Sequence, residues 1–203
     1  MTATRLAEVP LLPEIQLYQA AEQAGLFDSG YSSDRPPPFW AFAWPGGVAL
    51  ARHLLDRPET VRGRRVVDLG SGSGVVAIAA FLAQAQGVRA VDADPAAVTA
   101  IERNADANGA QVEAVLGEAD PVRIADAEVI LVGDAFYTAA VAAAMTKLLS
   151  AAARRGVEVL VGDPGRGFLP RHLLGEVARY DVPVRPALED TKVKPTTVWR
   201  FTV

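Results

Sequence analysis

Three glycines at alternate positions are the first residues whose type and spacing indicate chemistry. Gly70, Gly72 and Gly74 follow a short apolar run that contains Asp68, within RVVDLGSGSG at residues 65–74. Because glycine has no Cβ, this spacing lets the chain turn sharply after a strand and lets a ligand contact the backbone. A dinucleotide-binding loop would need glycine at the sixth position, which is a valine here. The pattern therefore favours a ligand loop of another type, and the alternative is a strand-to-helix turn without a ligand.

An acidic residue ends the next apolar run. Val88–Val91 is followed by Asp92, close to the interval of about 20 residues at which the acid of a βαβ unit binds ribose hydroxyls. Asp94 precedes Pro95, so we expect Asp94 to cap the next helix. We therefore predict that Asp92 binds a ribose, with a solvated turn acid as the alternative.

Later strand ends carry further candidates, because ligands of an open parallel sheet bind beyond the carboxyl ends of its strands. Glu118 or Asp120 could accept the amino hydrogens of an adenine, or either could be a solvated loop acid. Asp134 and Tyr137, in GDAFY, are one helical turn apart at an expected helix start, so both can face the cleft. A carboxylate or phenol there can orient or deprotonate an amine, whose pKa is about 10.4 in lysine. The alternative makes Asp134 a helix cap and Tyr137 a core aromatic.

An aromatic cluster precedes these segments. Phe39, Trp40, Phe42 and Trp44 lie within FWAFAW, after a polar, proline-rich stretch at 28–38 that we expect to be a loop. Aromatic faces can attract a sulfonium or an amine by about 0.5–2 kcal/mol. The cluster is predicted either to cover a ligand or to belong to the core.

The expected elements alternate between strands and helices, which is typical of a parallel sheet covered on both faces. Helices are predicted over Pro13–Leu26, Pro45–Asp56, 75–85, Pro95–Asn108, Tyr137–Arg154 and Pro170–Tyr180. Strands are predicted over Val66–Leu69, Val88–Val91, Gln111–Leu116, Ala127–Val132, Val157–Val161, Val182–Ala187 and Thr197–Val203. Because only a short loop separates the last two strands, we expect them to pair as an antiparallel hairpin.

Composition narrows the function. The chain has 203 residues and no cysteine, so we expect one domain without disulfides, thiolate metal sites or a cysteine nucleophile. His53 and His172 are isolated, so no metal site is predicted. A net charge of -4 with scattered arginines argues against a nucleic-acid partner. The absence of an apolar run of about 18 residues argues against a membrane span, and we expect a cytoplasmic protein.

These segments together resemble the seven-strand protein lysine methyltransferases with a D-x-x-Y motif, and most closely the electron-transfer flavoprotein β-subunit lysine methyltransferase group. D-x-G-x-G-x-G is the form typical of class I methyltransferases, whereas FWAFAWPGG with GDAFY and GDPGR is specific to this group. The resemblance covers nearly the whole chain, through LLPEIQLYQA, PPPFWAFAWPGGVALARHLLD, VVDLGSGSGVVAIAA, VDADP, GDAFY, VGDPGR and TTVWRF.

The resemblance implies an α/β, Rossmann-like seven-stranded sheet of order 3-2-1-4-5-7-6 with an antiparallel last strand. Residues 61–203 would form this core and residues 1–60 a helical and aromatic cover, within one domain. It also implies S-adenosyl-L-methionine as methyl donor and S-adenosyl-L-homocysteine as product. The implied cofactor-binding residues are Trp44, Asp68, Gly70, Ser71, Gly72, Gly74, Asp92, Ala93, Glu118 and Asp134. The implied catalytic residues are Asp134 and Tyr137, and the implied substrate contacts are Trp40, Trp44, Tyr137 and Trp199.

The resemblance further implies a monomer that methylates lysine on the flavoprotein β subunit, with ribosomal protein as another substrate class. Members of the group are often labelled ribosomal protein L11 methyltransferases, although this sequence shows no counterpart of the recruiting domain of those enzymes. Two alternatives remain: a small-molecule N- or O-methyltransferase, and a non-catalytic module that uses the same fold to bind a partner.

Overall fold

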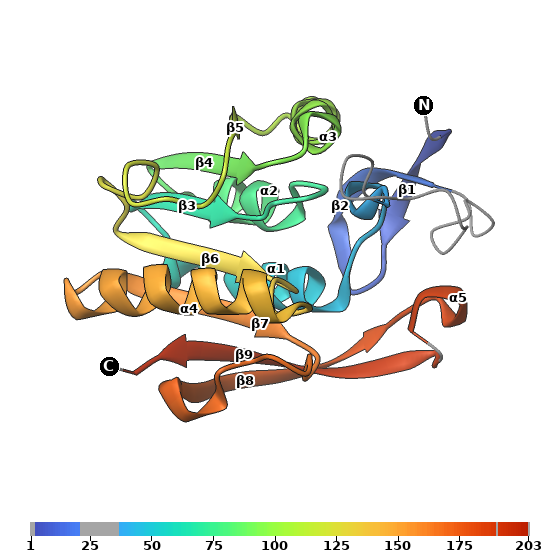
Figure 1. Ribbon diagram of the computed structural model, residues 1–203. Helices are drawn as coiled ribbons and strands as arrows, with labels where there is room; N and C mark the ends of the chain where they lie inside the picture. Colours follow the sequence, from blue (N-terminus) through green and yellow to red (C-terminus); the bar gives the residue numbers. More distant parts are fainter. Residues whose placement is uncertain (1–2, 21–36, 190, 203) are drawn as a thin grey trace.

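The computed structural model describes residues 3–20, 37–189 and 191–202, and its centre is a seven-stranded sheet (Figure 1). The strand order is β5-β4-β3-β6-β7-β9-β8, and β9 runs antiparallel to both of its neighbours whereas the other pairs are parallel. The predicted order and the antiparallel last strand are therefore confirmed. The strands are β3 (Arg65–Leu69), β4 (Gly87–Asp92), β5 (Glu113–Leu116), β6 (Val129–Gly133), β7 (Glu158–Asp163), β8 (Leu174–Pro183) and β9 (Val193–Phe201).

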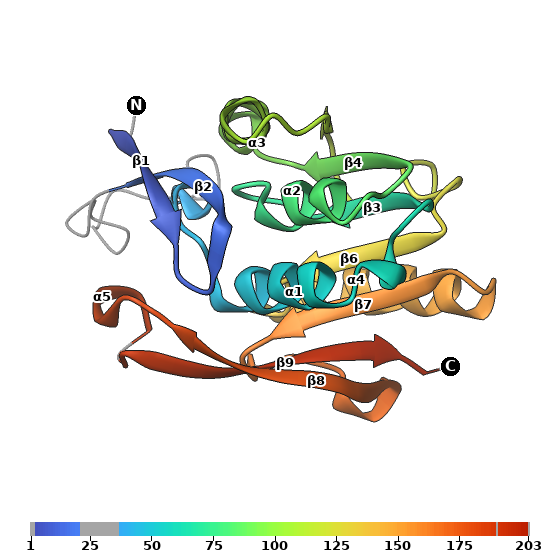
Figure 2. The same cartoon turned by 180° about the vertical axis from the view of Figure 1, so that it is seen from behind.

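Helices cover both faces of the sheet, as Figures 1 and 2 show. The longer helices are α1 (Pro45–Asp56), α2 (Val75–Leu82), α3 (Pro95–Ala107) and α4 (Ala139–Arg154). Helices α1, α2 and α3 share one buried cluster with Leu131 of β6, whereas α4 packs with Ile130 and Val132 of the same strand. Successive residues of a strand face opposite sides, so a continuously apolar strand serves two cores. No helix among the described residues is long and apolar enough to cross a membrane.

The amino-terminal segment is a β-hairpin, so the predicted helix over Pro13–Leu26 is wrong for its described part, whereas the helix predicted over Pro45–Asp56 is present as α1. Strands β1 (Thr4–Val9) and β2 (Leu12–Ala20) pair antiparallel. Ile15 and Leu17 are fully buried while Gln16 between them is exposed, which is the two-residue period of a strand. The helical interpretation depended on alanines, which fit either period. Residues 21–36, with the rest of that helix and most of the predicted loop, lie outside the described part.

The carboxyl-terminal region also differs from expectation. The predicted helix over Pro170–Tyr180 is wrong: a single 3-10 turn (Arg171–Leu173) leads directly into β8, and α5 (Pro186–Glu189) is a short turn of helix before β9. The predicted antiparallel pairing of the last two strands is confirmed, but β8 begins earlier and pairs along all of β9, from Leu174↔Phe201 to Pro183↔Val193. Pairing with a neighbouring strand outweighs the local helix preference here.

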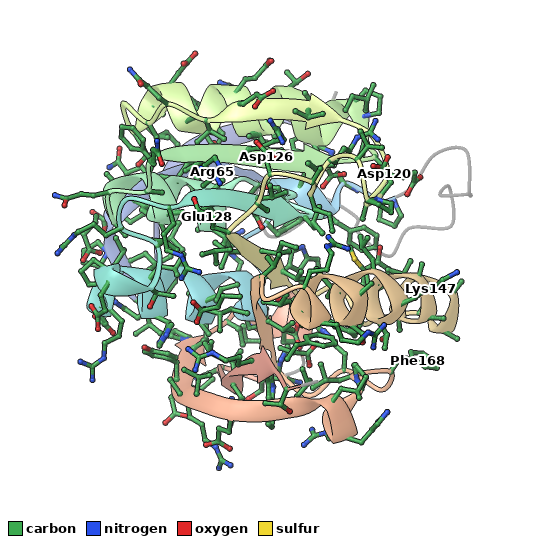
Figure 3. The ribbon with its side chains drawn as sticks, turned by 90° about the vertical axis from the view of Figure 1, so that its left-hand side faces the viewer. Arg65, Asp120, Asp126, Glu128, Lys147 and Phe168 are labelled. Carbon is green, nitrogen blue, oxygen red and sulfur yellow. The ribbon has the colours of Figure 1, made fainter. Side chains whose placement is uncertain are left out.

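Charged side chains gather at the amino ends of the strands, on the edge that faces the viewer in Figure 3. Arg65 donates to the carbonyl oxygen of Asp126 at 2.9 Å and pairs with Glu128 at 3.3 Å. Both side chains of the latter pair are more than 40 % exposed, and such pairs contribute about 0–1 kcal/mol. This pair therefore contributes little to stability, and it lies at the end of the strands opposite the candidate site.

Four glycines bring the start of α1 against the carboxyl ends of β6 and β7. A Cβ on Gly162 would lie 2.0 Å from the carbonyl oxygen of Gly46, and a Cβ on Gly133 would lie 2.8 Å from Cα of Gly47. Both distances are shorter than any real Cβ contact, so these backbones can approach only as glycines. The close approach places the segment before α1, including Trp44, beside the ends of the central strands.

The glycine contact predicts a large loss of stability for Gly162→Ala, by about 3 kcal/mol or more, because the added methyl group overlaps backbone that cannot move away. Gly87→Ala is the matched control, since a Cβ on Gly87 meets nothing within 4 Å. Chemical denaturation measures the free energy of unfolding of both variants and of the wild type. Equal losses for the two variants would show that the helix start tolerates displacement.

Candidate active site

The glycine loop between β3 and α2 has the left-handed conformation that glycine permits. Gly70, Gly72 and Gly74 have φ values of +65°, +55° and +80°. The amides of Gly70 and Ser71 donate to the carbonyl oxygen of Val91 at 2.9 and 3.2 Å, which ties the loop to β4. A Cβ on Gly70 would meet no atom within 4 Å, so a ligand can reach the backbone there. The loop thus has the shape that the glycine spacing predicted.

Asp68, near the end of β3 just before this loop, is only 1 % exposed. Its Oδ2 accepts a hydrogen bond from Ser71 Oγ at 2.5 Å, and the amide of Ala77 in α2 also donates to the carboxylate. Burial raises the pKa of Asp68 to about 7, because these neutral donors only partly replace water. Asp68 therefore fixes the shape of the loop, and any effect on a cofactor acts through that shape.

Asp92 ends β4 next to the loop. Its Oδ2 accepts from the amide of Gly72 at 2.9 Å and its Oδ1 from the amide of Asp94 at 3.0 Å. The side chain is half-buried, and this burial raises its pKa. Asp94 accepts from the amide of Ala96, which confirms the predicted helix cap. Because a carboxylate has about four lone-pair sites, Asp92 keeps acceptor capacity for a ligand.

Asp134 occupies the turn between β6 and α4 with a φ of +52°, which is uncommon for a residue with a side chain. Its Oδ2 accepts from the amide of Gly47 at the start of α1 at 3.1 Å. Its Oδ1 accepts from Nη2 and Nε of Arg166 at 2.8 and 3.2 Å. Burial raises the pKa of Asp134 to about 6, although the adjacent Arg166 opposes the shift.

The expectation that Asp134 and Tyr137 stand at a helix start is wrong. Helix α4 begins later, at Ala139, and Thr138 caps it by accepting from the amide of Val141. The two residues therefore lie in the preceding turn, where Asp134 is 9 % exposed and Tyr137 52 % exposed. They are brought to the same end of the sheet but do not share one exposed face.

Arg166 lies in GDPGR, a strand-end segment that also carries the family resemblance, but the sequence interpretation gave this residue no role. It links Asp134 to Glu189 of α5, with 2.6 Å between Nη2 and Oε1, and its guanidinium carbon lies 5.8 Å from the centre of the Trp44 ring. Asp163 shapes this loop by accepting from the amides of Gly165 and Arg166. The only signal in the sequence was GDPGR at a strand end, which does not reveal partners so distant along the chain.

Aromatic side chains form the wall over the site. The Phe39 ring lies 5.8 Å from the Trp44 ring and 5.9 Å from the Tyr137 ring, and Trp44 Nε1 donates to the Phe39 carbonyl oxygen at 2.8 Å. Burial, followed by the carboxylates of Asp92 and Glu118, raises the pKa of Tyr137. Phe39, Trp44 and Tyr137 therefore form one aromatic group, and the charges of Asp92 and Glu118 act on its Tyr137 hydroxyl.

The remaining residues predicted from the sequence have fewer contacts with the glycine loop and the aromatic wall. Cα of Trp40 lies 3.9 Å from the position of a Cβ on Gly72, so Trp40 borders the glycine loop. Ala93 and Glu118 are exposed, whereas Asp120 accepts hydrogen bonds from Arg123. Trp199 is not brought to the site: it packs with the α4 core and pairs with Val161, two residues before the end of β7.

Comparisons with known proteins identify a family and several relatives of this chain. The model of the ribosomal protein L11 methyltransferase (PrmA) family matches residues 50–155. An electron transfer flavoprotein β-subunit lysine methyltransferase of Rattus norvegicus is 37% identical over 94% of this chain and 78% of its own length. Its Xenopus laevis counterpart is 36% identical over 98% and 83%. The L11 methyltransferase of Symbiobacterium thermophilum is 39% identical, but over only 41% of this chain and 27% of its own length.

Solved structures show the same fold. A 16S rRNA N2 G1207 methyltransferase of T. thermophilus, in complex with AdoMet and guanosine, has a TM-score of 0.62 over 100% of this chain and 52% of its own, at 20% identity. An RNA methyltransferase of Salinibacter ruber, in complex with S-adenosyl-L-homocysteine, has a TM-score of 0.52 over 76% of this chain and 90% of its own, also at 20% identity. At these identities the likeness supports the class I methyltransferase fold and not a substrate.

The pKa of Asp68 predicts how stability depends on pH. The native state keeps this proton up to pH values near 7, whereas the unfolded chain loses it near 4, so the contribution of Asp68 to the free energy of unfolding falls as pH rises. Asp68→Asn cannot titrate, so its stability relative to wild type should rise between about pH 5 and about pH 8.

Asp126→Asn is the control for this measurement, because the hydrogen bond from Arg89 lowers the pKa of Asp126 and leaves it ionised in both states over that range. Chemical denaturation at several pH values compares the two variants. If the difference in free energy of unfolding between Asp68→Asn and wild type stays constant with pH, the raised pKa of Asp68 is contradicted.

Proposed function

From the premise that the chain belongs to the electron transfer flavoprotein β-subunit lysine methyltransferase family and matches the PrmA family model, we propose that its substrate is the β subunit of electron transfer flavoprotein. It is an S-adenosylmethionine-dependent methyltransferase that acts on protein lysine. The observation that carries the substrate proposal is the identity to these relatives over nearly the whole chain. Monomeric state, cytoplasmic location and the absence of a nucleic-acid partner stay predictions from the sequence.

The proposed cofactor site follows the edge from β3 to β6. The open backbone at Gly70 and the remaining acceptor capacity of Asp92 fit an adenosine-bearing ligand. When bound, the cofactor supplies an electrophilic methyl group on sulfonium. The proposed binding residues are, of those predicted from the sequence, Trp44, Gly70, Ser71, Gly72, Gly74, Asp92, Ala93 and Glu118, while Asp68 acts by holding the shape of the loop.

The proposed lysine site lies between the aromatic wall and the turn after β6. Protein donors take three of the roughly four acceptor sites of Asp134, so about one remains for an N–H of the amine. The raised pKa of Asp134 makes this carboxylate a better proton acceptor near neutral pH than an ordinary one. Tyr137, half-exposed beside Phe39, is placed to orient the incoming amine, while Trp44 borders its path.

Asp92→Ala tests the cofactor site. Loss of a charged acceptor for the ribose should weaken S-adenosylhomocysteine binding by about ten- to hundredfold, or roughly 1.5–3 kcal/mol. Asp106→Ala, at an exposed acid of α3, is the matched control and should bind as wild type does. Titration calorimetry on folded variants measures both affinities. An unchanged affinity for Asp92→Ala would show that the ribose binds elsewhere.

Methyl transfer to purified flavoprotein from the same organism tests the substrate. Folded flavoprotein should gain methyl groups on lysine Nζ of its β subunit, located by mass spectrometry, in preference to ribosomal protein or small amines. Tyr137→Phe should lower kcat by about tenfold or more without weakening S-adenosylhomocysteine binding, because the loss falls on orientation and proton transfer.

Tyr180→Phe is the matched control, since the Tyr180 hydroxyl contacts His53 and Asp56 far from the site. Methylation of ribosomal protein alone would overturn the flavoprotein proposal and leave the enzyme a protein lysine methyltransferase. Methyl groups found only on a small metabolite would overturn both.

A further inference from the structure

Asn104 of α3 and Asn108, which caps the carboxyl end of this helix, hold the amino-terminal hairpin by its backbone. Asn108 Oδ1 accepts from the amide of Gln16 at 2.9 Å, and Asn108 Nδ2 donates to the Gln16 carbonyl oxygen at 2.6 Å. One turn earlier on the helix, Asn104 Oδ1 accepts from the amide of Tyr18 at 2.7 Å. A helical turn of about 5.4 Å and two strand residues of about 6.6 Å are similar in length, so the two amides follow the edge of β2 as a partner strand would.

Asn104 has a second partner in the glycine loop. Its Nδ2 donates to the Ser73 carbonyl oxygen at 2.8 Å, and the residue is 0 % exposed. Tyr18 offers a donor and Ser73 an acceptor, so only one orientation of the Asn104 amide satisfies both. Ser73 stands between two glycines of positive φ, and the amide of the first of them, Gly72, donates to Asp92. A single buried side chain therefore bridges the proposed cofactor loop and β2.

The hairpin in turn contacts the aromatic wall. Ala20, at the end of β2, is 1 % exposed and clusters with Ala41 and Phe42, against which Trp40 and Trp44 pack. The Arg103 guanidinium, 3.4 Å from the centre of the Tyr18 ring, holds the same strand to α3. A continuous set of contacts thus runs from Asp92 through Asn104 and β2 to the segment that borders the proposed lysine site.

We propose that Asn104 is a positioning residue for methyl transfer, which couples occupation of the glycine loop to docking of the hairpin and the aromatic segment. Binding at the loop fixes the Ser73 carbonyl, which holds the Asn104 amide and through it the amide of Tyr18. Because coupling between sites is reciprocal, a firmly docked hairpin also favours binding at the loop. The proposal rests on the proposed function for the position of the cofactor.

Hydrogen exchange of the hairpin amides, with and without S-adenosylhomocysteine, tests the coupling. In the wild type the ligand should slow exchange within residues 12–20 by about fivefold or more, in addition to protecting residues 70–74. In Asn104→Ala the loop should still gain protection, but the hairpin should exchange equally fast with and without the ligand. Asn108→Ala loosens the hairpin without touching the loop, so its hairpin should exchange faster overall yet still respond to the ligand.

Kinetics give a second readout. Asn104→Ala should weaken S-adenosylhomocysteine binding and raise KM for the protein substrate, whereas Asn108→Ala, whose hairpin still responds to the ligand, should raise KM and weaken S-adenosylhomocysteine binding less than Asn104→Ala does. If the ligand protects the loop of the wild type but does not slow exchange in its hairpin, the coupling is overturned and the proposed function is left intact. This outcome is measured on the wild type alone, so it holds even if Asn104→Ala fails to fold. Retained hairpin protection in Asn104→Ala would also overturn it. No protection of residues 70–74 in the wild type would instead contradict the proposed cofactor site itself.

Discussion

The close contact between the start of α1 and the ends of β6 and β7 is the constraint on which the rest of the candidate site depends. Gly162 and Gly46 approach to a distance that leaves no room for a Cβ, and this brings the amide of Gly47 to the Asp134 carboxylate. A helix start carries unpaired amides and a partial positive charge, so a buried carboxylate is well placed there. The same approach places Trp44, which directly precedes α1, beside Arg166.

Asp68 and Asp134 are buried carboxylates of the site with different donors, which act differently on their pKa values. Asp68 receives only neutral donors, and burial raises its pKa to about 7. Burial also raises the pKa of Asp134, to about 6, but the guanidinium of Arg166 opposes this shift. Arg166 is itself held by Glu189, which also pairs with Lys194 of β9 at 3.3 Å. Buried charges are tolerated when each has such a partner, so the carboxyl-terminal hairpin contributes to the electrostatics of the site.

The cofactor half of the molecule was predictable from sequence because its signals are local. Glycines at alternate positions permit a loop of positive φ, and an acid that ends a parallel strand stands at the ligand-binding edge of the sheet. The hairpin and β8 were mistaken for helices because alanine fits both periods and because pairing with a distant strand outweighs local preference. Arg166, Glu189 and Asn104 gave no usable signal, since each acts through partners far along the chain. For the same reason Asp134 could be selected as a site residue, but its attachment to α1 could not be foreseen.

The central claim is that the start of α1 and Arg166 fix the Asp134 carboxylate in the position from which it accepts from a lysine amine. A crystal structure with S-adenosylhomocysteine and a lysine-containing peptide of the substrate tests this claim most directly. The account predicts the ribose hydroxyls on Asp92 and the lysine Nζ between Trp44 and Tyr137. It also predicts that Asp134 keeps its hydrogen bonds to Gly47 and Arg166. A ribose placed away from Asp92, or an Asp134 carboxylate released from Gly47 to reach the amine, would contradict it.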